Sequence, residues 1–162
     1  MSEYRAPAGT DIGHVHLKVA DLERAIAFYH GVLGFDVTAR YGTQAAFLSA
    51  GGYHHHIGLN TWESKGGEPA PHGHTGLYHV AIRYAARAEL AGAVRRLLEA
   101  RHPLQGASDH GVSEAIYLED PDGNGIELYW DRPKEDWPKG PKGELQMPTK
   151  ALDLDALLQL AN

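Results

Sequence analysis

Two distant stretches of the chain show the same alternation of apolar and polar residues. Residues 12–19 read IGHVHLKV, and residues 77–84 read LYHVAIRY, with His79 in the place that His14 holds in the first stretch. Alternation with a period of two is typical of a β-strand with one buried face. Each stretch is followed by a segment with helical spacing of apolar residues, so the sequence predicts a structural unit that occurs twice.

The predicted helices cover residues 21–34 and 86–102, and Asp21 lies where a helix N-cap belongs. Further short strands complete each unit, which gives an α+β fold with two tandem βαβββ modules. They are predicted at residues 35–40, 45–49 and 54–61 in the first unit, and at residues 103–107, 114–119 and 125–131 in the second. The predicted boundaries are an N-terminal arm (1–11), a first module (12–62), a linker (63–76), a second module (77–131) and a C-terminal arm (132–162) with a short helix at 151–160.

Composition narrows the classes of partner. Hydrophobic residues make up 43% of the chain and charged residues 22%, and no apolar run approaches the ~20 residues that span a bilayer. The start of the sequence lacks a basic region followed by an apolar core, so we expect a cytoplasmic location and no membrane partner. A formal charge of −6 argues against a nucleic-acid partner, because such binding relies on clustered Lys and Arg. We therefore expect a small-molecule ligand.

The same composition limits the kind of metal site that is available. The chain has no cysteine and eleven histidines. Disulfides and thiolate-bound metals are thereby excluded, and any metal site must consist of His, Asp and Glu side chains.

Residues 110–129 predict a β-hairpin. The turn at residues 120–125 reads DPDGNG and is flanked by two runs of strand-type composition. In the second run Glu127 lies between apolar residues on the opposite face. A carboxylate at mid-strand must be solvated, paired or bound to a cation, since its burial alone costs several kcal/mol. An outward-facing, solvated Glu127 is the simple alternative.

His14, His79 and Glu127 can form a site if the two sheets face each other. Two imidazoles and one carboxylate on one side of a divalent ion are the arrangement associated with non-haem Fe(II) oxygenases. The spacing of these residues does not establish the site by itself.

Longer motifs resemble a known family. Residues 13–35, GHVHLKVADLERAIAFYHGVLGF, resemble the vicinal oxygen chelate superfamily, which includes glyoxalase I, bleomycin-resistance proteins and type I extradiol dioxygenases. The pattern His110-x5-Ile116-Tyr117-x2-Asp120-Pro121-x-Gly123-x3-Glu127 resembles the extradiol ring-cleavage signature of the catechol 2,3-dioxygenase kind. The resemblance covers residues 12–131 and implies that the paired modules form a curved mixed sheet around a cleft.

The resemblance also implies roles for single residues. His14, His79 and Glu127 match the metal ligands, with Fe(II) as the expected metal and Mn(II) as the alternative. His55 matches the active-site base. A shift of the alignment by one residue would place His54 or His56 at that position instead. His110 and Tyr117 match residues that hydrogen-bond the substrate oxygens. Gly58 falls where glyoxalase I would need a fourth ligand.

The activity implied by the resemblance is ring cleavage of a catechol-type aromatic diol by O2, next to the diol. Phe47, Ile57 and Ile82 are expected to line the aromatic pocket. The resembled dioxygenases usually carry two pairs of modules, whereas this chain carries one, so we expect a homo-oligomer, most simply a dimer. Two alternatives stay open: a small-molecule binding protein of the bleomycin-resistance kind, and a glyoxalase-type metal-dependent lyase or isomerase.

Overall fold

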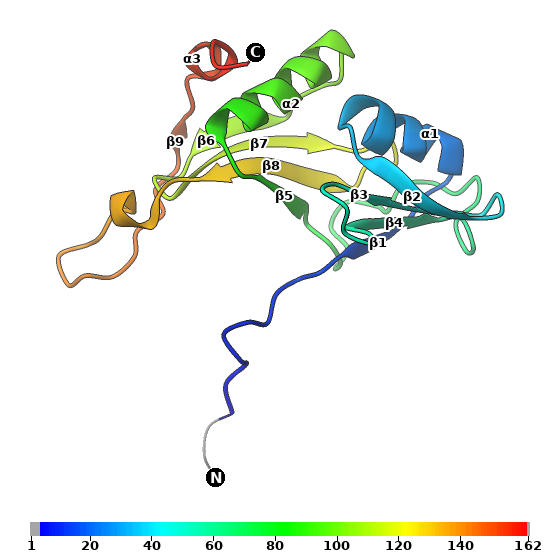
Figure 1. Ribbon diagram of the computed structural model, residues 1–162, viewed down its shortest axis with the longest axis horizontal. Helices are drawn as coiled ribbons and strands as arrows, with labels where there is room; N and C mark the ends of the chain where they lie inside the picture. The colour runs from blue at the N-terminus through cyan, green and yellow to red at the C-terminus, as the bar shows by residue number, and fades with distance from the viewer. Residues whose placement is uncertain (1–3, 162) are drawn as a thin grey trace.

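The computed structural model describes residues 4–161 as two βαβββ modules whose helices lie on the same side of two sheets (Figure 1). The predicted N-terminal and C-terminal arms extend to residues 1–3 and 162, which lie outside the described residues. The fold class predicted from the sequence is confirmed. The structure forms two sheets of four and five strands, with no strand pairing between them among the described residues.

The first module supplies a four-stranded sheet in the order β1-β4-β3-β2, in which β1 and β4 are parallel and the other pairs antiparallel. Its strands are short: β3 and β4 are buried and rich in apolar residues, whereas the edge strand β2 is largely exposed. The bounds are β1 Val15–Lys18, α1 Leu22–Ile26, η1 Ala27–Val32, β2 Asp36–Tyr41, β3 Ala45–Ser49 and β4 Ile57–Asn60.

The second module repeats this order, with β5 parallel to β8 and antiparallel pairs for β8-β7 and β7-β6. A fifth strand, β9 (Lys150–Ala151), joins from the C-terminal arm and pairs with β6. The other bounds are β5 Val80–Tyr84, α2 Arg87–Glu99, β6 Gly106–Asp109, β7 Ser113–Glu119 and β8 Gly125–Asp131.

The first predicted helix is shorter in α-geometry than the sequence pattern indicates. The side chain of Asp21 accepts a hydrogen bond from the backbone of Arg24, as an N-cap does. After only five α-helical residues the chain widens into the π-type segment η1, which ends before Gly34 with its positive φ of 82°. Gly34 therefore stops the helical segment where the sequence predicts.

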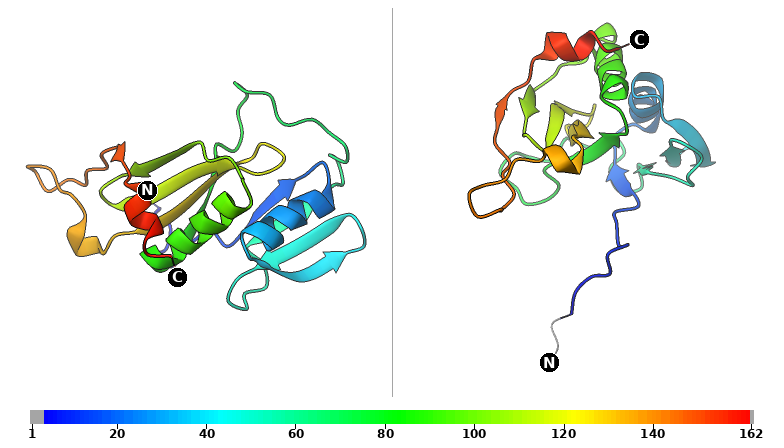
Figure 2. Two further views of the ribbon diagram at one scale, coloured as in Figure 1. Left: turned by 90° about the horizontal axis from the view of Figure 1, so that it is seen from above. Right: turned by 60° about the vertical axis from the view of Figure 1, so that its left-hand side comes forward.

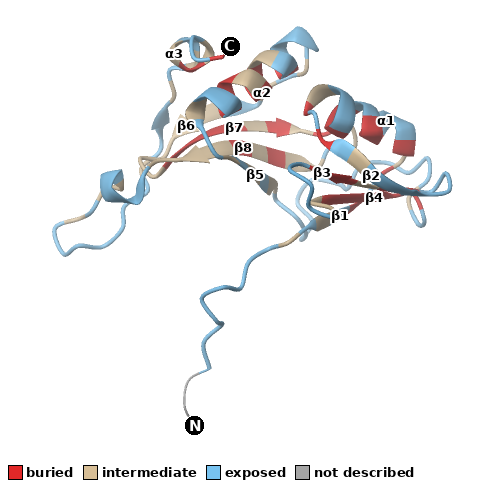
Figure 3. Ribbon diagram, in the orientation of Figure 1, coloured by how far each residue is buried: buried red, intermediate tan, exposed pale blue. Residues whose placement is uncertain are grey.

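One hydrophobic core extends beneath the helices of both modules, as the buried residues of Figure 3 show. The helices bury one side toward the sheets, and alternate residues of the central strands point back toward the helices. The opposite face of each sheet carries the remaining alternate residues. Among them are the histidines and carboxylate predicted to be functional.

One group of polar contacts between the modules lies at the turn after β7, and Arg96 of α2 forms another with the carbonyls of Gly31 and Val32. Asp120 is 4% exposed and accepts a hydrogen bond from the hydroxyl of Tyr29, 2.9 Å away in the first module. The side chain of Asp122 accepts hydrogen bonds from Arg24 at 2.7 Å and from the backbone of Ala20 at 2.9 Å. The predicted turn thus also joins the two modules.

The C-terminal arm runs back over its own module (Figure 2). It contains the short 3₁₀ helix η2 (Lys134–Asp136), β9 and the helix α3 (Leu154–Leu158). The predicted helix at 151–160 is too long, because Lys150 and Ala151 pair with β6 instead. Leu157 is fully buried where α3 packs against α2, and Arg95 donates hydrogen bonds to the carbonyls of Leu158 and Ala161. None of the helices within residues 4–161 is long and apolar enough to cross a membrane.

Candidate functional site

The second module brings four of the predicted residues together on one face of its sheet. Glu127 lies in the middle of β8 and pairs in register with Ala81 of β5. Ala81 is two residues after His79, so His79 and Ala81 belong to the same face. The His79 Nε2 and Glu127 Oε2 atoms are 3.0 Å apart. The other oxygen of Glu127 accepts a hydrogen bond of 3.2 Å from the hydroxyl of Tyr117 on β7. Glu127 is therefore paired and largely buried, rather than solvated as the simple alternative proposed.

Tyr117 connects Glu127 to His110. Its hydroxyl lies 2.8 Å from Nε2 of His110, at the turn that joins β6 to β7. Burial raises the pKa of Tyr117 to about 12, and the nearby Glu127 carboxylate adds to the rise. Tyr117 therefore keeps its proton at neutral pH. The four side chains form one continuous line from His79 through Glu127 and Tyr117 to His110.

The first module holds the other two predicted residues close to each other. His14 directly precedes β1, and its ring centroid is 4.4 Å from that of His55. The ring centroid of Phe47 lies 5.0 Å from that of His55. Desolvation lowers the pKa of His55, and the neighbouring imidazoles of His14 and His54 lower it further. His55 is therefore a neutral imidazole at neutral pH, as an acceptor of protons must be.

The three consecutive histidines have different surroundings. His54 is exposed, and its Nδ1 lies 2.8 Å from Nδ1 of His55. His56 points toward the preceding turn, where its Nδ1 contacts the hydroxyl of Ser49 and accepts a hydrogen bond from the backbone of Ala50. Of the three, His55 is the one whose ring contacts His14.

The internal repeat explains why the two modules differ at one position. In the first module His16 pairs in register with Gly58, exactly as Ala81 pairs with Glu127 in the second. Gly58 is therefore the counterpart of Glu127 and carries no ligand. A Cβ atom at residue 58 would lie 2.9 Å from the imidazole of His16, so a carboxylate there would displace this ring. The arrangement does not suit a fourth ligand at residue 58.

The structure does not bring all six predicted residues into one cluster. His14 and His55 lie on the first module, whereas His79, Glu127, Tyr117 and His110 lie on the second. Within residues 4–161 no group of three His, Cys, Asp or Glu side chains is placed so that it could hold a metal ion. The set of His14, His79 and Glu127 remains a prediction, with two of its members in contact.

The expected aromatic pocket is only partly correct. Phe47 pairs in register with Gly58 and contacts His55 and His16, which places it on the face that carries the histidines. Ile57 is buried in the core, and Ile82 packs against that core from β5. Both isoleucines point toward the helices because they alternate with the residues of the other face, so their prediction as pocket residues is wrong.

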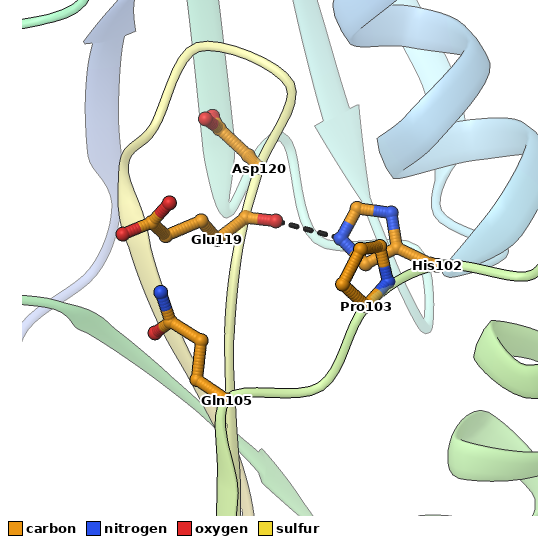
Figure 4. Close-up of a pocket in the computed structure, with 5 residues that line it drawn as sticks. All are labelled: His102, Pro103, Gln105, Glu119 and Asp120. Atoms are coloured by element: carbon orange, nitrogen blue, oxygen red, sulfur yellow. Dashed lines mark hydrogen bonds between the residues drawn. The ribbon is translucent and has the colours of Figure 1, made fainter.

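A surface pocket of about 200 Å³ lies elsewhere, near the junction of the modules (Figure 4). It is lined by His102, Pro103, Gln105, Glu119 and Asp120. His102 Nε2 lies 2.7 Å from the carbonyl oxygen of Glu119, and Asp120 takes part in the contacts of the turn. None of the six predicted residues lines this pocket, and we do not assign the function to it.

Comparison with known proteins places the chain in a family. The sequence model of the family described as "Glyoxalase/Bleomycin resistance protein/Dioxygenase superfamily" matches residues 11–128. The chain belongs to this superfamily. Two solved structures of similar fold are those of a glyoxalase/dioxygenase from Nostoc punctiforme and a lactoylglutathione lyase from Agrobacterium tumefaciens. The first gives a TM-score of 0.66 at 19% identity and covers 82% of this chain and 99% of its own. The second gives a TM-score of 0.59 at 22% identity, and the match covers 76% of this chain and 96% of the lyase chain.

A curated relative is more similar in sequence. The chain is 42% identical over 154 residues to a protein named "Catechol-2,3-dioxygenase" from Bacillus subtilis (strain 168). The match covers 94% of this chain and 52% of the relative. The chain thus spans about half the length of that curated relative.

Proposed function

We propose that this superfamily member is an Fe(II)-dependent extradiol dioxygenase that cleaves a catechol-type aromatic diol with O2. The observation that carries the proposal is the line of His79, Glu127, Tyr117 and His110, which holds a carboxylate, an imidazole and a protonated phenol on one face of a sheet. The 42% identity to a protein named for catechol 2,3-dioxygenation supports it.

The donor set of this face suits a divalent metal. Imidazole nitrogen and carboxylate oxygen are both ligands that divalent first-row metals accept. His79 Nε2 and Glu127 Oε2 are 3.0 Å apart, so both could bind one ion. We propose that these two residues hold Fe(II) together with His14, with Mn(II) as the alternative metal. When bound, the metal would act as a Lewis acid toward the diol and O2 and draw electron density toward oxygen.

The remaining residues would orient the diol and move its protons. Tyr117 keeps its proton, so it can donate a hydrogen bond to a substrate oxygen or share one with His110. The neutral imidazole of His55 would accept a proton from the diol, and the ring of Phe47 beside it offers an apolar surface to the aromatic ring. In the reaction one ring bond next to the diol breaks, and both atoms of O2 enter the ring-opened semialdehyde. The diol is oxidised and O2 is reduced.

The proposal is tested by reconstituting the chain with Fe(II) without air, adding catechol and admitting air. We expect O2 consumption and a yellow ring-opened product at matching rates. A His79→Ala/Glu127→Ala double variant is the control that should form none. Tight binding of catechol without O2 consumption would favour the binding-protein alternative instead. The lack of a ligand at Gly58 argues against the glyoxalase-type alternative.

Metal retention is expected to depend on Glu127. Its replacement by glutamine keeps the size of the side chain but removes the only protein anion of the proposed site, so we expect Fe(II) affinity to fall at least about tenfold. Competition with a coloured chelator measures this. A Glu119→Gln variant, which changes a carboxylate outside the site, is the matched control. Equal affinities for the two variants would contradict the role of Glu127.

We also expect a homo-oligomer, most simply a dimer. Large apolar side chains are exposed before β1 (Ile12), before β5 (Leu77 and Tyr78) and after β4 (Trp62). Exposed apolar side chains that form a patch are usually covered by a partner. Because α3 packs on α2 of its own chain, the contact need not use the C-terminal helix. Light scattering should give a mass near twice 17.7 kDa at micromolar concentration, and a monomer mass would contradict the prediction. The cytoplasmic location remains a prediction.

A further inference from the structure

The C-terminal arm passes directly over the turn that carries His110. Residues 146–151, here called the strap, lie beyond residues 11–128, which the family model matches. At its end the strap pairs with β6, where Asp109 is in register with Lys150. A Cβ atom at Gly111 would come within 3.3 Å of Pro148, so the turn and the strap are closely packed. Figure 1 shows β9 beside β6 at this edge of the sheet.

The strap contacts the ring of His110 on the side away from Tyr117. Nδ1 of His110 lies 3.1 Å from the carbonyl oxygen of Pro148 and 3.4 Å from the hydroxyl of Thr149. A carbonyl oxygen can only accept a hydrogen bond, so Nδ1 must carry the proton. The hydrogen bond at one ring nitrogen of a histidine decides the state of the other. In neutral His110, Nε2 is then an acceptor that faces Tyr117.

This tautomer decides where the proton of Tyr117 goes. The hydroxyl has one proton and two neighbouring acceptors, Nε2 of His110 at 2.8 Å and Glu127 Oε1 at 3.2 Å. With Nε2 as an acceptor, the hydroxyl proton is shared between the shorter contact to His110 and the longer contact to Glu127. With the opposite tautomer, Nε2–H would donate to Tyr117, and Tyr117 would have to donate to Glu127.

We propose that the strap is a positioning element of the site: the Pro148 carbonyl holds His110 as the Nδ1–H tautomer, which draws the proton of Tyr117 away from Glu127 and makes that carboxylate a stronger ligand for a cation. The inference rests on the proposed function for its purpose, but the contacts that carry it are all between residues of this chain. Pro148 and Thr149 are thus positioning residues that act through His110.

The first test is the tautomer in the protein of residues 1–162, prepared without metal and labelled with ¹⁵N-histidine. Long-range ¹H–¹⁵N correlation spectra distinguish the two tautomers, and a His110→Gln variant assigns the signals. We expect the Nδ1–H pattern for His110, with a slowly exchanging Hδ1 proton. An Nε2–H pattern in the unmodified protein would overturn the inference without any need for a further variant.

The second test releases the strap within the full chain. A Lys150→Pro/Ala151→Pro variant removes both backbone N–H groups of β9, and Lys150→Ala, which keeps them, is the matched control. We expect the double variant to show mixed tautomers and an Fe(II) affinity lower by about tenfold, the usual range for groups that orient a ligand. A folded double variant with the spectrum and affinity of the control would overturn the inference. Neither the tautomer nor the Fe(II) affinity needs a substrate to be measured. If both give the expected result and the protein still fails to cleave catechol, only the proposed function is refuted.

Discussion

Replacing His55 with phenylalanine is expected to lower turnover of catechol by about 10²–10⁴-fold, the usual contribution of a positioned acid or base. Phenylalanine keeps the flat ring that packs against His14 and Phe47, so the local structure should survive. It removes the neutral nitrogen whose pKa burial and the neighbouring imidazoles lower. Fe(II) binding should not change, because His55 is not among the proposed ligands.

Single-turnover measurements on the Fe(II)-loaded variants would isolate this step from substrate binding. His54→Phe is the matched control, since His54 is adjacent in sequence and exposed. His56→Phe should act mainly through the turn at Ser49. A large loss at His54 with none at His55 would move the base by one residue, and no loss at any of the three histidines would remove the base from the mechanism.

Asp120→Ala is expected to lower the free energy of unfolding by about 3 kcal/mol. The buried carboxylate accepts hydrogen bonds from the hydroxyl of Tyr29, the backbone of Asp122, and both the backbone and the side-chain amide of Asn124. Alanine would leave the fully buried Tyr29 hydroxyl without an acceptor and loosen the turn at the same time. Burial and the Asp120 carboxylate raise the pKa of Tyr29, so its hydroxyl remains a donor over the ordinary pH range.

Urea unfolding of the two variants Asp120→Ala and Tyr29→Phe separates these contributions. Tyr29→Phe removes the donor together with its hydrogen bond and leaves the turn intact, so it should cost only about 1 kcal/mol. Equal losses in the two variants would show that the turn contacts add nothing to the contact between the modules.

Much of the architecture follows from local sequence patterns. The alternation before each helix and the DPDGNG turn predict β1, β5 and the β7–β8 hairpin, because burial on one face imposes a period of two. The same period could have excluded Ile82 from the pocket, since it alternates with Ala81 and shares its face with neither His79 nor Ala81. The proximity of His79 to Glu127 needed only the parallel pairing of the first and last strands of a module.

Other features depend on contacts that local patterns do not encode. The two residues of β9 are too few to show a period, and their pairing depends on the path of the whole arm. Pro148 acts through its backbone carbonyl, which any residue would supply. The residue type at this position therefore does not indicate the contact with His110. The distance of His14 from the second module depends on how the two sheets sit relative to each other, which a repeat in the sequence does not determine.

The one-sided joining of the modules has a mechanical consequence. The contacts of Tyr29 and Arg24 with the turn lie at the helix side and at one end of the strands, and the β1 and β5 edges share no strand pairing among the described residues. Two modules that are joined along one side can rotate about that side as about a hinge, and a small rotation then gives a larger displacement at the opposite side. The opposite side carries His14 on the first module and His79 with Glu127 on the second. The opening angle of this hinge therefore sets the width of the gap that a metal ion and a flat aromatic ring must bridge.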